Sequence, residues 1–321
     1  MKVRITGTGW ELPEYEADNN YLSTIVETSD EWITERTGIR KRHLVKDETT
    51  TSLAAGAAKK ALLNAGMKAE EIQLLIVATI SSDTETPSTA CQVQALLGAA
   101  HAVAFDINAA CSGFLYAVHI AEAFIKSGMY ENALLIGAET LSKLVDWTDR
   151  GTCVLFGDGA GAAVLTASES QGILSQSIGS NGSKWEVLSC AGRPNQNPLC
   201  QGEGTPGYLR MDGQEVFKFA VKTVPICIED ALKKAGLSPD EVTYFLLHQA
   251  NRRIIQSVAK RLKQPEERFP MNIDQCANTS AASLPILLAQ MNEQGRLHPG
   301  DRLVLSGFGA GLTWGACVLE W

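Results

Sequence analysis

Cys111 has the sequence setting best suited to covalent chemistry. It lies in VAFDINAACSGFLYAVHIAEAFIKSG, where an apolar strand expected over 103–107 turns through small residues into an apolar helix. The dipole and the free backbone N–H groups of a helix start favour the thiolate, which is the reactive form of cysteine. The small neighbours Ala109, Ala110 and Ser112 leave room for an acyl group to approach. We therefore predict that Cys111 is a nucleophile.

The other seven cysteines carry no such signal. A cysteine taken at random is most often a small buried hydrophobe, and these residues lie in apolar segments or loops without a comparable strand-turn-helix setting. No two of them have the C-x-x-C spacing of a zinc site or a redox dithiol. We expect reduced thiols at positions 91, 153, 190, 200, 227, 276 and 317.

A histidine and an asparagine later in the chain could complete a site. His248 ends an apolar run at 244–247 and opens QANRRIIQSVAKRL, so we expect it to occupy in the second half a place like that of Cys111 in the first. Asn278, in CANTSAASLP, could donate an amide hydrogen bond to developing negative charge. A histidine that ends a strand for purely structural reasons is the alternative for His248, and the asparagine alone is a weak signal.

The elements that must position these residues alternate along the chain. Short apolar runs at 74–78 and 103–107 predict strands, while 52–65 and 114–125 repeat apolar residues at helical spacing. Such alternation is typical of an α/β protein with largely buried sheets.

An internal repeat indicates how the halves are arranged. Segment 61–79 (ALLNAGMKAEEIQLLIVAT) resembles segment 231–249 (ALKKAGLSPDEVTYFLLHQ) without gaps, so that position 61 aligns with position 231. A second similarity pairs FGDGAGAAVL at 156–165 with FGAGLTWGACVLEW at 308–321, and chance resemblance between common α/β segments is the alternative. We predict two similar halves, 1–170 carrying the cysteine and 171–321 carrying the histidine and asparagine.

Residues 182–213 interrupt this pattern. They hold six glycines and three prolines, which predicts a long irregular excursion that could act as a flap.

Composition narrows the class of protein. The 321 residues are 45% hydrophobic and 20% charged, as in an ordinary globular protein, and the net charge of −8 argues against nucleic-acid binding. The longest apolar run, 74–80, is far shorter than the roughly 18 residues that cross a bilayer. The first residues lack an export signal, so we expect a cytoplasmic protein without a membrane partner.

Five motifs taken together resemble the β-ketoacyl-acyl-carrier-protein synthase III family of thiolase-fold condensing enzymes. They are DINAACSGF, HQANRRI, CANTSAAS, FGDGAGAAVL and the terminal FGAGLTWGA. The resemblance runs essentially end to end and includes residues 28–43 and 146–152. One departure is Ala277, where the family usually has glycine before the asparagine, and we expect its effect to be mild.

The resemblance implies a fold, an assembly and a reaction. The fold would have two duplicated halves in an α/β/α/β/α arrangement, and the protein would be a homodimer without cofactor or metal. The reaction would be a decarboxylative Claisen condensation of an acyl-CoA primer with malonyl-acyl-carrier protein. It would give 3-ketoacyl-acyl-carrier protein, CO2 and CoA, and would initiate fatty acid biosynthesis.

The resemblance also implies the catalytic roles. Cys111, His248 and Asn278 would be catalytic, with a ping-pong course through an acyl-cysteine. The backbone N–H groups of Cys111 and Ala310 would form the oxyanion hole. His248 would need its proton on the nitrogen that faces the substrate, and the sequence leaves that tautomer open.

Binding residues follow from the same resemblance. Trp32, Arg36 and Arg150 would hold the CoA nucleotide, and Asn251 would line the pantetheine tunnel; a packing anchor and solvated charges are the alternatives. The acidic acyl carrier protein would dock on a basic surface, which could otherwise be an ordinary solvated helix face. That surface comprises Lys218, Arg253, Lys260 and Arg261.

Thr86 is expected to set primer size. Several relatives have a bulky aromatic residue there that shortens the acyl pocket of the neighbouring subunit, so a threonine predicts longer or more branched primers. Two other functions stay open: a related condensing enzyme of secondary metabolism with another acceptor, and a non-catalytic scaffold that binds acyl carriers. Primer identity and pathway do not follow from the sequence.

Overall fold

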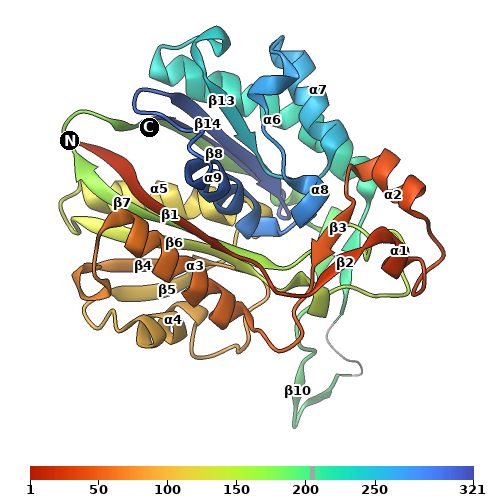
Figure 1. The fold of residues 1–321 in the computed structure, drawn as a ribbon. Helices are drawn as coiled ribbons and strands as arrows, with labels where there is room; N and C mark the ends of the chain where they lie inside the picture. Colours follow the sequence, from red (N-terminus) through yellow and green to blue (C-terminus); the bar gives the residue numbers. More distant parts are fainter. Residues whose placement is uncertain (203–206) are drawn as a thin grey trace.

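Two sheets form the frame of the molecule, and the computed structural model describes residues 1–202 and 207–321 (Figure 1). The first sheet has the order β1-β7-β6-β4-β5 and the second β13-β14-β15-β8. The first comprises β1 (Lys2–Glu11), β4 (Leu74–Ala78), β5 (Val103–Ile107), β6 (Asn132–Glu139) and β7 (Gly159–Ser168). The second comprises β8 (Gly172–Ser180), β13 (Tyr244–Leu247), β14 (Arg302–Gly309) and β15 (Thr313–Glu320).

The two sheets repeat one pattern of strand directions. In the first, β4 and β6 are parallel, and β6, β7 and β1 follow in antiparallel order. In the second, β13 and β14 are parallel, and β14, β15 and β8 follow in antiparallel order. β5 extends the first sheet beyond β4 in parallel.

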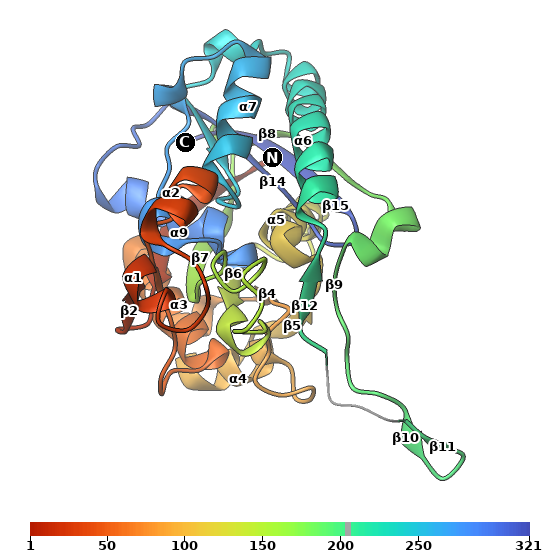
Figure 2. The ribbon, with the colours of Figure 1, turned by 90° about the vertical axis from the view of Figure 1, so that its right-hand side faces the viewer.

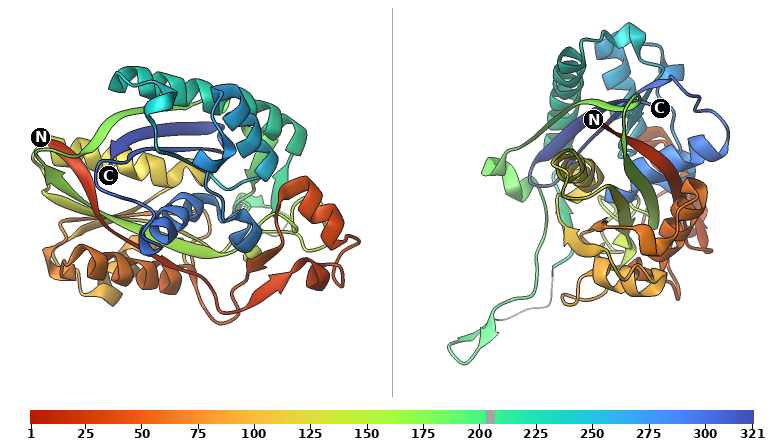
Figure 3. Two further views of the ribbon diagram at one scale, coloured as in Figure 1. Left: turned by 45° about the horizontal axis from the view of Figure 1, so that its top comes forward. Right: turned by 90° about the vertical axis from the view of Figure 1, so that its left-hand side faces the viewer.

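Helices cover both faces of each sheet and one helical layer lies between them (Figures 1 and 3). α3 (Thr50–Ala65) and α4 (Thr89–Leu97) pack on the outer face of the first sheet. α5 (Gly113–Lys126) and α9 (Ser283–Glu293) fill the space between the sheets, and α6 (Gly213–Ala235) and α7 (Arg252–Leu262) cover the second. The predicted α/β/α/β/α fold is confirmed.

Strand β4 shows why the sequence builds these layers. Its five residues are all buried because side chains alternate between two covered faces. Leu74 and Ile76 point into the central core with α5 and α9, while Leu75 and Val77 point into the outer core with α3. An uninterrupted apolar run is therefore what this position requires.

The repeat seen in the sequence has a structural counterpart. α3 ends at Ala65 with Gly66 at φ 66°, and α6 ends at Ala235 with Gly236 at φ 71°, so both helices close with a left-handed glycine. The division into halves at residue 170 stays a prediction. That position lies between the end of β7 and the start of β8.

The excursion predicted as irregular is partly regular, which corrects the prediction. β9 (Leu188–Cys190) pairs with β12 (Leu209–Met211), and β10 (Gln196–Asn197) pairs with β11 (Cys200–Gln201). Figure 2 shows that the β10–β11 hairpin projects away from the body of the chain. Residues 203–206 of the predicted range lie outside the described residues.

A further group of short helices and strands lies at one end of the sheets (Figure 1). They comprise β2 (Glu16–Asp18), α1 (Asn19–Leu22), α2 (Asp30–Thr37), β3 (Lys41–His43) and α8 (Ile273–Cys276).

Candidate active site

Cys111 lies where the sequence predicted, between a strand and a helix. A 3-10 turn over Ala110–Ser112 follows β5 and leads into α5, and Ala110 takes the left-handed φ of 46°. Non-glycine residues in this region are strained, and such strain gathers at functional sites. Cys111 lines two cavities.

The charge state of Cys111 differs from the sequence expectation. Burial raises the pKa of its thiol to about 12, and the nearby Ser280 hydroxyl lowers it only in part. The helix start therefore does not produce a resting thiolate, because desolvation outweighs it. The thiol must lose its proton as the substrate arrives.

His248 directly follows β13 and lines the second cavity together with Cys111. Its Nδ1 lies 2.6 Å from Oγ of Ser283, and its ring packs edge-on against Phe308 with centroids 5.5 Å apart. Burial lowers the pKa of the imidazole to about 3. The ring is therefore neutral near pH 7 and carries a single N–H.

Asn278 lines the same cavity. Its Oδ1 accepts a hydrogen bond from the backbone N–H of Ser280 at 2.9 Å. Its backbone bridges to Phe156 beside the cavity. Because the amide oxygen is occupied, the NH2 group is the part left to donate to a ligand.

The C-terminal glycine loop closes over Cys111. A Cβ on Gly309 would lie 2.7 Å from the backbone nitrogen of Cys111, so only glycine permits this approach. The Thr313 hydroxyl donates to the carbonyl of Ala109 at 3.1 Å and ties the loop to the cysteine turn. Ala310 follows the glycine and lines the first cavity with Cys111.

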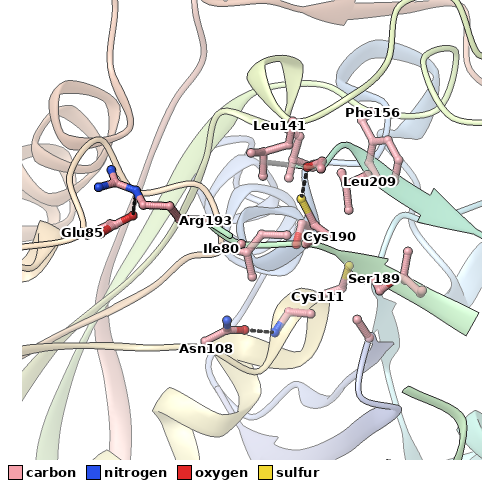
Figure 4. A pocket seen from close by; sticks show the side chains of 18 residues that line it. Ile80, Glu85, Asn108, Cys111, Leu141, Phe156, Ser189, Cys190, Arg193 and Leu209 are labelled. Carbon is pink, nitrogen blue, oxygen red and sulfur yellow. Dashed lines mark hydrogen bonds and ion pairs between the residues drawn. The ribbon is translucent and has the colours of Figure 1, made fainter. Parts of the chain in front are cut away.

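The first cavity is mainly apolar. It has a volume of about 380 Å³, and Figure 4 shows Cys111 among its lining side chains. Near its rim Arg193 pairs with Glu85 at 3.4 Å. Its apolar side chains are those of Ile80, Leu141, Leu144, Phe156, Leu188 and Leu209. A cavity of this kind suits an aliphatic chain attached to the sulfur.

The second cavity leads from Cys111 to an aromatic and cationic rim. It has a volume of about 240 Å³ and is lined by Trp32, Arg36, Arg150 and Asn251 as well as by the three candidate catalytic residues. The guanidinium carbons of Arg36 and Arg150 lie 4.6 and 4.8 Å from the Trp32 ring centroid. Asn251 also caps α7 by accepting from the N–H of Arg253, so it has a structural role too.

The expected symmetry between Cys111 and His248 is wrong. In the alignment of the internal repeat, the 3-10 turn over Ala110–Ser112 matches the turn over Ser280–Ala282, and Ser280 repeats the left-handed φ of Ala110 at 48°. The counterpart of Asn278 is therefore Asn108, which accepts from the N–H of Ala110 as Asn278 accepts from that of Ser280. His248 follows β13 as Ala78 ends β4.

Ala277 is a larger departure than the sequence suggests. Its φ of 55° and ψ of −156° lie in a region that is essentially reserved for glycine. Such a conformation costs about 1–3 kcal/mol for a residue with a Cβ. The expectation of a mild effect is therefore wrong for the backbone.

We expect Ala277→Gly to raise the free energy of unfolding by about 1 kcal/mol, since relief of strain exceeds the added freedom of glycine in the unfolded chain. Thermal unfolding should show an increase in Tm of about 2 °C. Ala289→Gly, within helix α9, is the matched control and should lower Tm. A lower Tm for Ala277→Gly would contradict the strain argument.

The remaining predicted residues lie outside these cavities. Arg253, Lys260 and Arg261 are exposed on α7, and Arg253 lies over the ring of Phe217, which lines the second cavity. Lys218 is exposed on α6 and pairs with Glu215 at 2.9 Å. In the part of the chain that the structure describes, Thr86 is exposed and stands outside the cavity lining, next to Glu85.

Three residues near the site were missed in the sequence. Ser280 lines the first cavity together with Cys111, and Ser283 contacts His248. Glu139 is buried beside Ser280, and burial raises the pKa of its carboxyl to about 7. The internal repeat was the available signal for the two serines, since its alignment places 108–113 opposite 278–283.

Two further features bear on the chemistry. Across residues 1–202 and 207–321, no three His, Cys, Asp or Glu side chains gather as metal ligands would. Every helix in that part of the chain is too short or too polar to cross a bilayer.

Known proteins resemble this chain over its whole length. Residues 105–182 match the family described as 3-oxoacyl-[acyl-carrier-protein (ACP)] synthase III, and residues 232–321 match the description 3-oxoacyl-[acyl-carrier-protein (ACP)] synthase III C terminal. A β-ketoacyl-[acyl-carrier-protein] synthase III of Clostridium novyi (strain NT) is 48% identical over 321 residues, with 99% of each chain covered.

Solved structures agree with these sequence matches. That of 3-oxoacyl-[acyl-carrier-protein] synthase III from Aquifex aeolicus VF5 has a TM-score of 0.93 and 47% identity, covering 99% of this chain and 100% of that one. The priming β-ketosynthase from the R1128 polyketide biosynthetic pathway has a TM-score of 0.93 and 34% identity, covering 99% and 96%.

Fold and relatives together define a thiolase-fold condensing enzyme, which is an acyltransferase. The predicted resemblance is confirmed. This chain belongs to the β-ketoacyl-[acyl-carrier-protein] synthase III family.

Proposed function

We propose that this chain condenses an acyl-CoA primer with malonyl-acyl-carrier protein and thereby initiates fatty acid biosynthesis. The observation that carries the proposal is the position of Cys111 between an apolar cavity and a second cavity lined by His248 and Asn278. One cavity suits the primer chain and the other suits the pantetheine arm that delivers it.

In the first half-reaction the sulfur of Cys111 attacks the thioester carbon of acyl-CoA. The C–S bond to CoA breaks, the CoA sulfur leaves, and the proton of the Cys111 thiol is transferred to it. The backbone N–H groups of Cys111 and Ala310 would hold the oxyanion, which the close approach of Gly309 to the cysteine supports. The product is an acyl-cysteine whose chain occupies the apolar cavity.

In the second half-reaction malonyl-acyl-carrier protein replaces CoA. Loss of CO2 leaves an enolate, whose carbon attacks the acyl-cysteine, forming the new C–C bond and releasing the Cys111 sulfur as a thiolate. A proton from water then restores the thiol. His248 and Asn278 would hydrogen-bond the thioester oxygen, on which negative charge develops. The neutral imidazole and the free NH2 group of Asn278 suit this donor role.

The CoA nucleotide would lie at the rim of the second cavity. Trp32 offers an aromatic face, and Arg36 and Arg150 offer guanidinium groups for phosphates. Asn251 would line the path of the pantetheine arm. This assignment rests on residue chemistry and on the shared cavity.

The acyl carrier protein would dock on the basic surface of Lys218, Arg253, Lys260 and Arg261 beside this cavity. We expect Arg253→Glu to raise the KM for malonyl-acyl-carrier protein about tenfold, because charges at an interface rim steer association. The rate of Cys111 acylation by acyl-CoA should change less than about twofold. Lys59→Glu, on the distant outer helix α3, is the control. Equal losses in both half-reactions would contradict the assignment.

We also propose a homodimer in which Thr86 limits the primer pocket of the neighbouring subunit. β5 ends the first sheet and exposes Val103, so its edge is available for a second copy. Thr86 is exposed, as a residue that reaches a neighbour must be.

We expect Thr86→Phe to lower acylation by branched or longer primers about tenfold while changing acetyl transfer less than about twofold, because the larger side chain fills space that only long primers use. Competition among mixed acyl-CoAs, followed by mass spectrometry of the acyl-enzyme, measures this ratio. An unchanged chain-length profile would show that Thr86 is not the gate.

A related condensing enzyme with another acceptor is the second candidate function. The similarity of this chain to the priming β-ketosynthase from the R1128 polyketide pathway supports this second candidate function. We place the reaction in the cytoplasm, and the eight free cysteines support that choice. We propose no cofactor or metal for either reaction.

A two-step assay tests the proposal. The purified chain is incubated with a panel of acyl-CoAs, and the mass added to Cys111 is recorded. Malonyl-acyl-carrier protein is then added, and 3-ketoacyl product is the expected result. Acylation without product would favour the other acceptor, and the absence of acylation would overturn the proposal.

A further inference from the structure

We infer that Ser283 is a positioning residue that fixes the tautomer of His248, so that the ring presents Nε2–H to the thioester of the carrier-bound substrate. The effect expected on turnover rests on the proposed function. The hydrogen-bond geometry from which the tautomer is inferred does not depend on that function.

The hydrogen-bond partners of the Ser283 hydroxyl indicate which nitrogen of His248 carries the proton. The hydroxyl oxygen accepts from the backbone N–H of Gln249 at 3.3 Å and lies 2.6 Å from Nδ1 of His248. Within residues 1–202 and 207–321 these are its two partners, and only the imidazole nitrogen can accept the hydroxyl proton. If Nδ1 were protonated, a buried hydroxyl proton would have no acceptor, which is costly.

The imidazole ring of His248 carries one N–H proton, on either Nδ1 or Nε2. Ser283 is 2% and His248 2% exposed, and burial keeps the imidazole neutral. With Nδ1 accepting from the serine, the proton is on Nε2. The second cavity, which His248 lines with Cys111 and Asn278, is the remaining space that the ring faces.

The first half of the chain shows that packing a helix start against the end of a strand does not itself need this hydroxyl. In the alignment of the internal repeat, the pair His248 and Ser283 matches the pair Ala78 and Gly113, and a Cβ on Gly113 would lie 2.9 Å from that of Ala78. In the first half these two positions therefore pack closely without a polar group. In the second half the corresponding positions are the serine and the histidine that carries the imidazole.

The expected effect of Ser283→Ala is selective. Decarboxylation of malonyl-acyl-carrier protein and condensation should fall about tenfold, since part of the ring population turns its proton to Nδ1. Acylation of Cys111 by acyl-CoA should change less than about twofold, because backbone N–H groups serve that step. Ser283→Thr keeps the hydroxyl and should restore most of the lost rate.

Nitrogen NMR provides a readout that a purely structural role would not move. In enzyme labelled with 15N-histidine at pH 7, the His248 resonances, identified by their loss in His248→Gln, should show a protonated Nε2 and an unprotonated, hydrogen-bonded Nδ1. In Ser283→Ala a measurable fraction should shift to the Nδ1–H form. Ser175→Ala, which removes a serine hydrogen bond to the Ala231 carbonyl away from the site, should leave the spectrum unchanged.

A protonated Nδ1 in the wild-type spectrum would overturn the inference. So would an unchanged tautomer in Ser283→Ala, or equal losses in acylation and decarboxylation. If the wild-type chain neither decarboxylates malonyl-acyl-carrier protein nor forms 3-ketoacyl product, the proposed function fails, while the spectrum still decides the tautomer.

Discussion

Cys111→Ala should abolish formation of the acyl-enzyme and lower condensation by about 10⁴-fold or more, since no other group can carry the primer between the half-reactions. The structure gives the physical reason. Cys111 lines both cavities, as do residues of the glycine loop, Ala310 in the first and Gly309 in the second. Intact-mass spectrometry after incubation with acyl-CoA measures the adduct directly.

Cys190→Ala is a matched control for this change. Cys190 lines the same apolar cavity, and its Sγ donates to the carbonyl of Gly207 at 3.1 Å, away from the catalytic residues. This variant should still form the acyl-enzyme. An acyl adduct of Cys111→Ala with the wild-type mass would show that another residue is the nucleophile.

Decarboxylation should survive in Cys111→Ala, to within about tenfold of the wild-type rate, because His248 and Asn278 still hold the thioester oxygen. Release of CO2 from malonyl-acyl-carrier protein without condensation product is therefore the expected signature. Loss of both activities together would indicate that the substitution disturbs the cavity rather than the nucleophile alone.

The sequence predicts strands most accurately where it has a short apolar run. The predicted runs at 74–78 and 103–107 coincide with β4 and β5, although only β4 is buried on both faces, while β5 is a partly exposed edge strand. The hairpin of β10 and β11 was missed, since its strands have two residues each and are too short to produce an alternation, and those of β10 are polar and exposed.

The site could be predicted as a set of residues but not as an electrostatic environment. Cys111, His248 and Asn278 were identified from motifs, and the structure brings all three to one cavity. The raised pKa of Cys111 depends on burial under the Gly309 loop, which lies in the other half of the chain, and no local pattern carries that information. Likewise, the contact between His248 and Ser283 follows from how the start of α9 packs against the end of β13.

His248→Ala and Asn278→Ala should each lower condensation by about 10²- to 10³-fold, the loss typical of one donor to a developing oxyanion. Their effects should not multiply. If both side chains donate to the same thioester oxygen, the double variant should lose about tenfold less than the product of the two single losses. Decarboxylation rates measured for the wild type, the two single variants and the double variant complete this double-mutant cycle.

The pH dependence separates a neutral donor from an acid–base role for His248. Since burial lowers the pKa of the imidazole to about 3, the ring stays neutral from pH 5 to pH 9, and charging it requires the pH to fall through about 3. The decarboxylation rate should therefore show no inflection from this histidine between pH 5 and pH 9. His248→Gln, which keeps an N–H donor, should retain more activity than His248→Ala at every pH. A rate that falls below a pKa near 6.5 in the wild type, and loses that dependence in His248→Gln, would contradict the neutral imidazole.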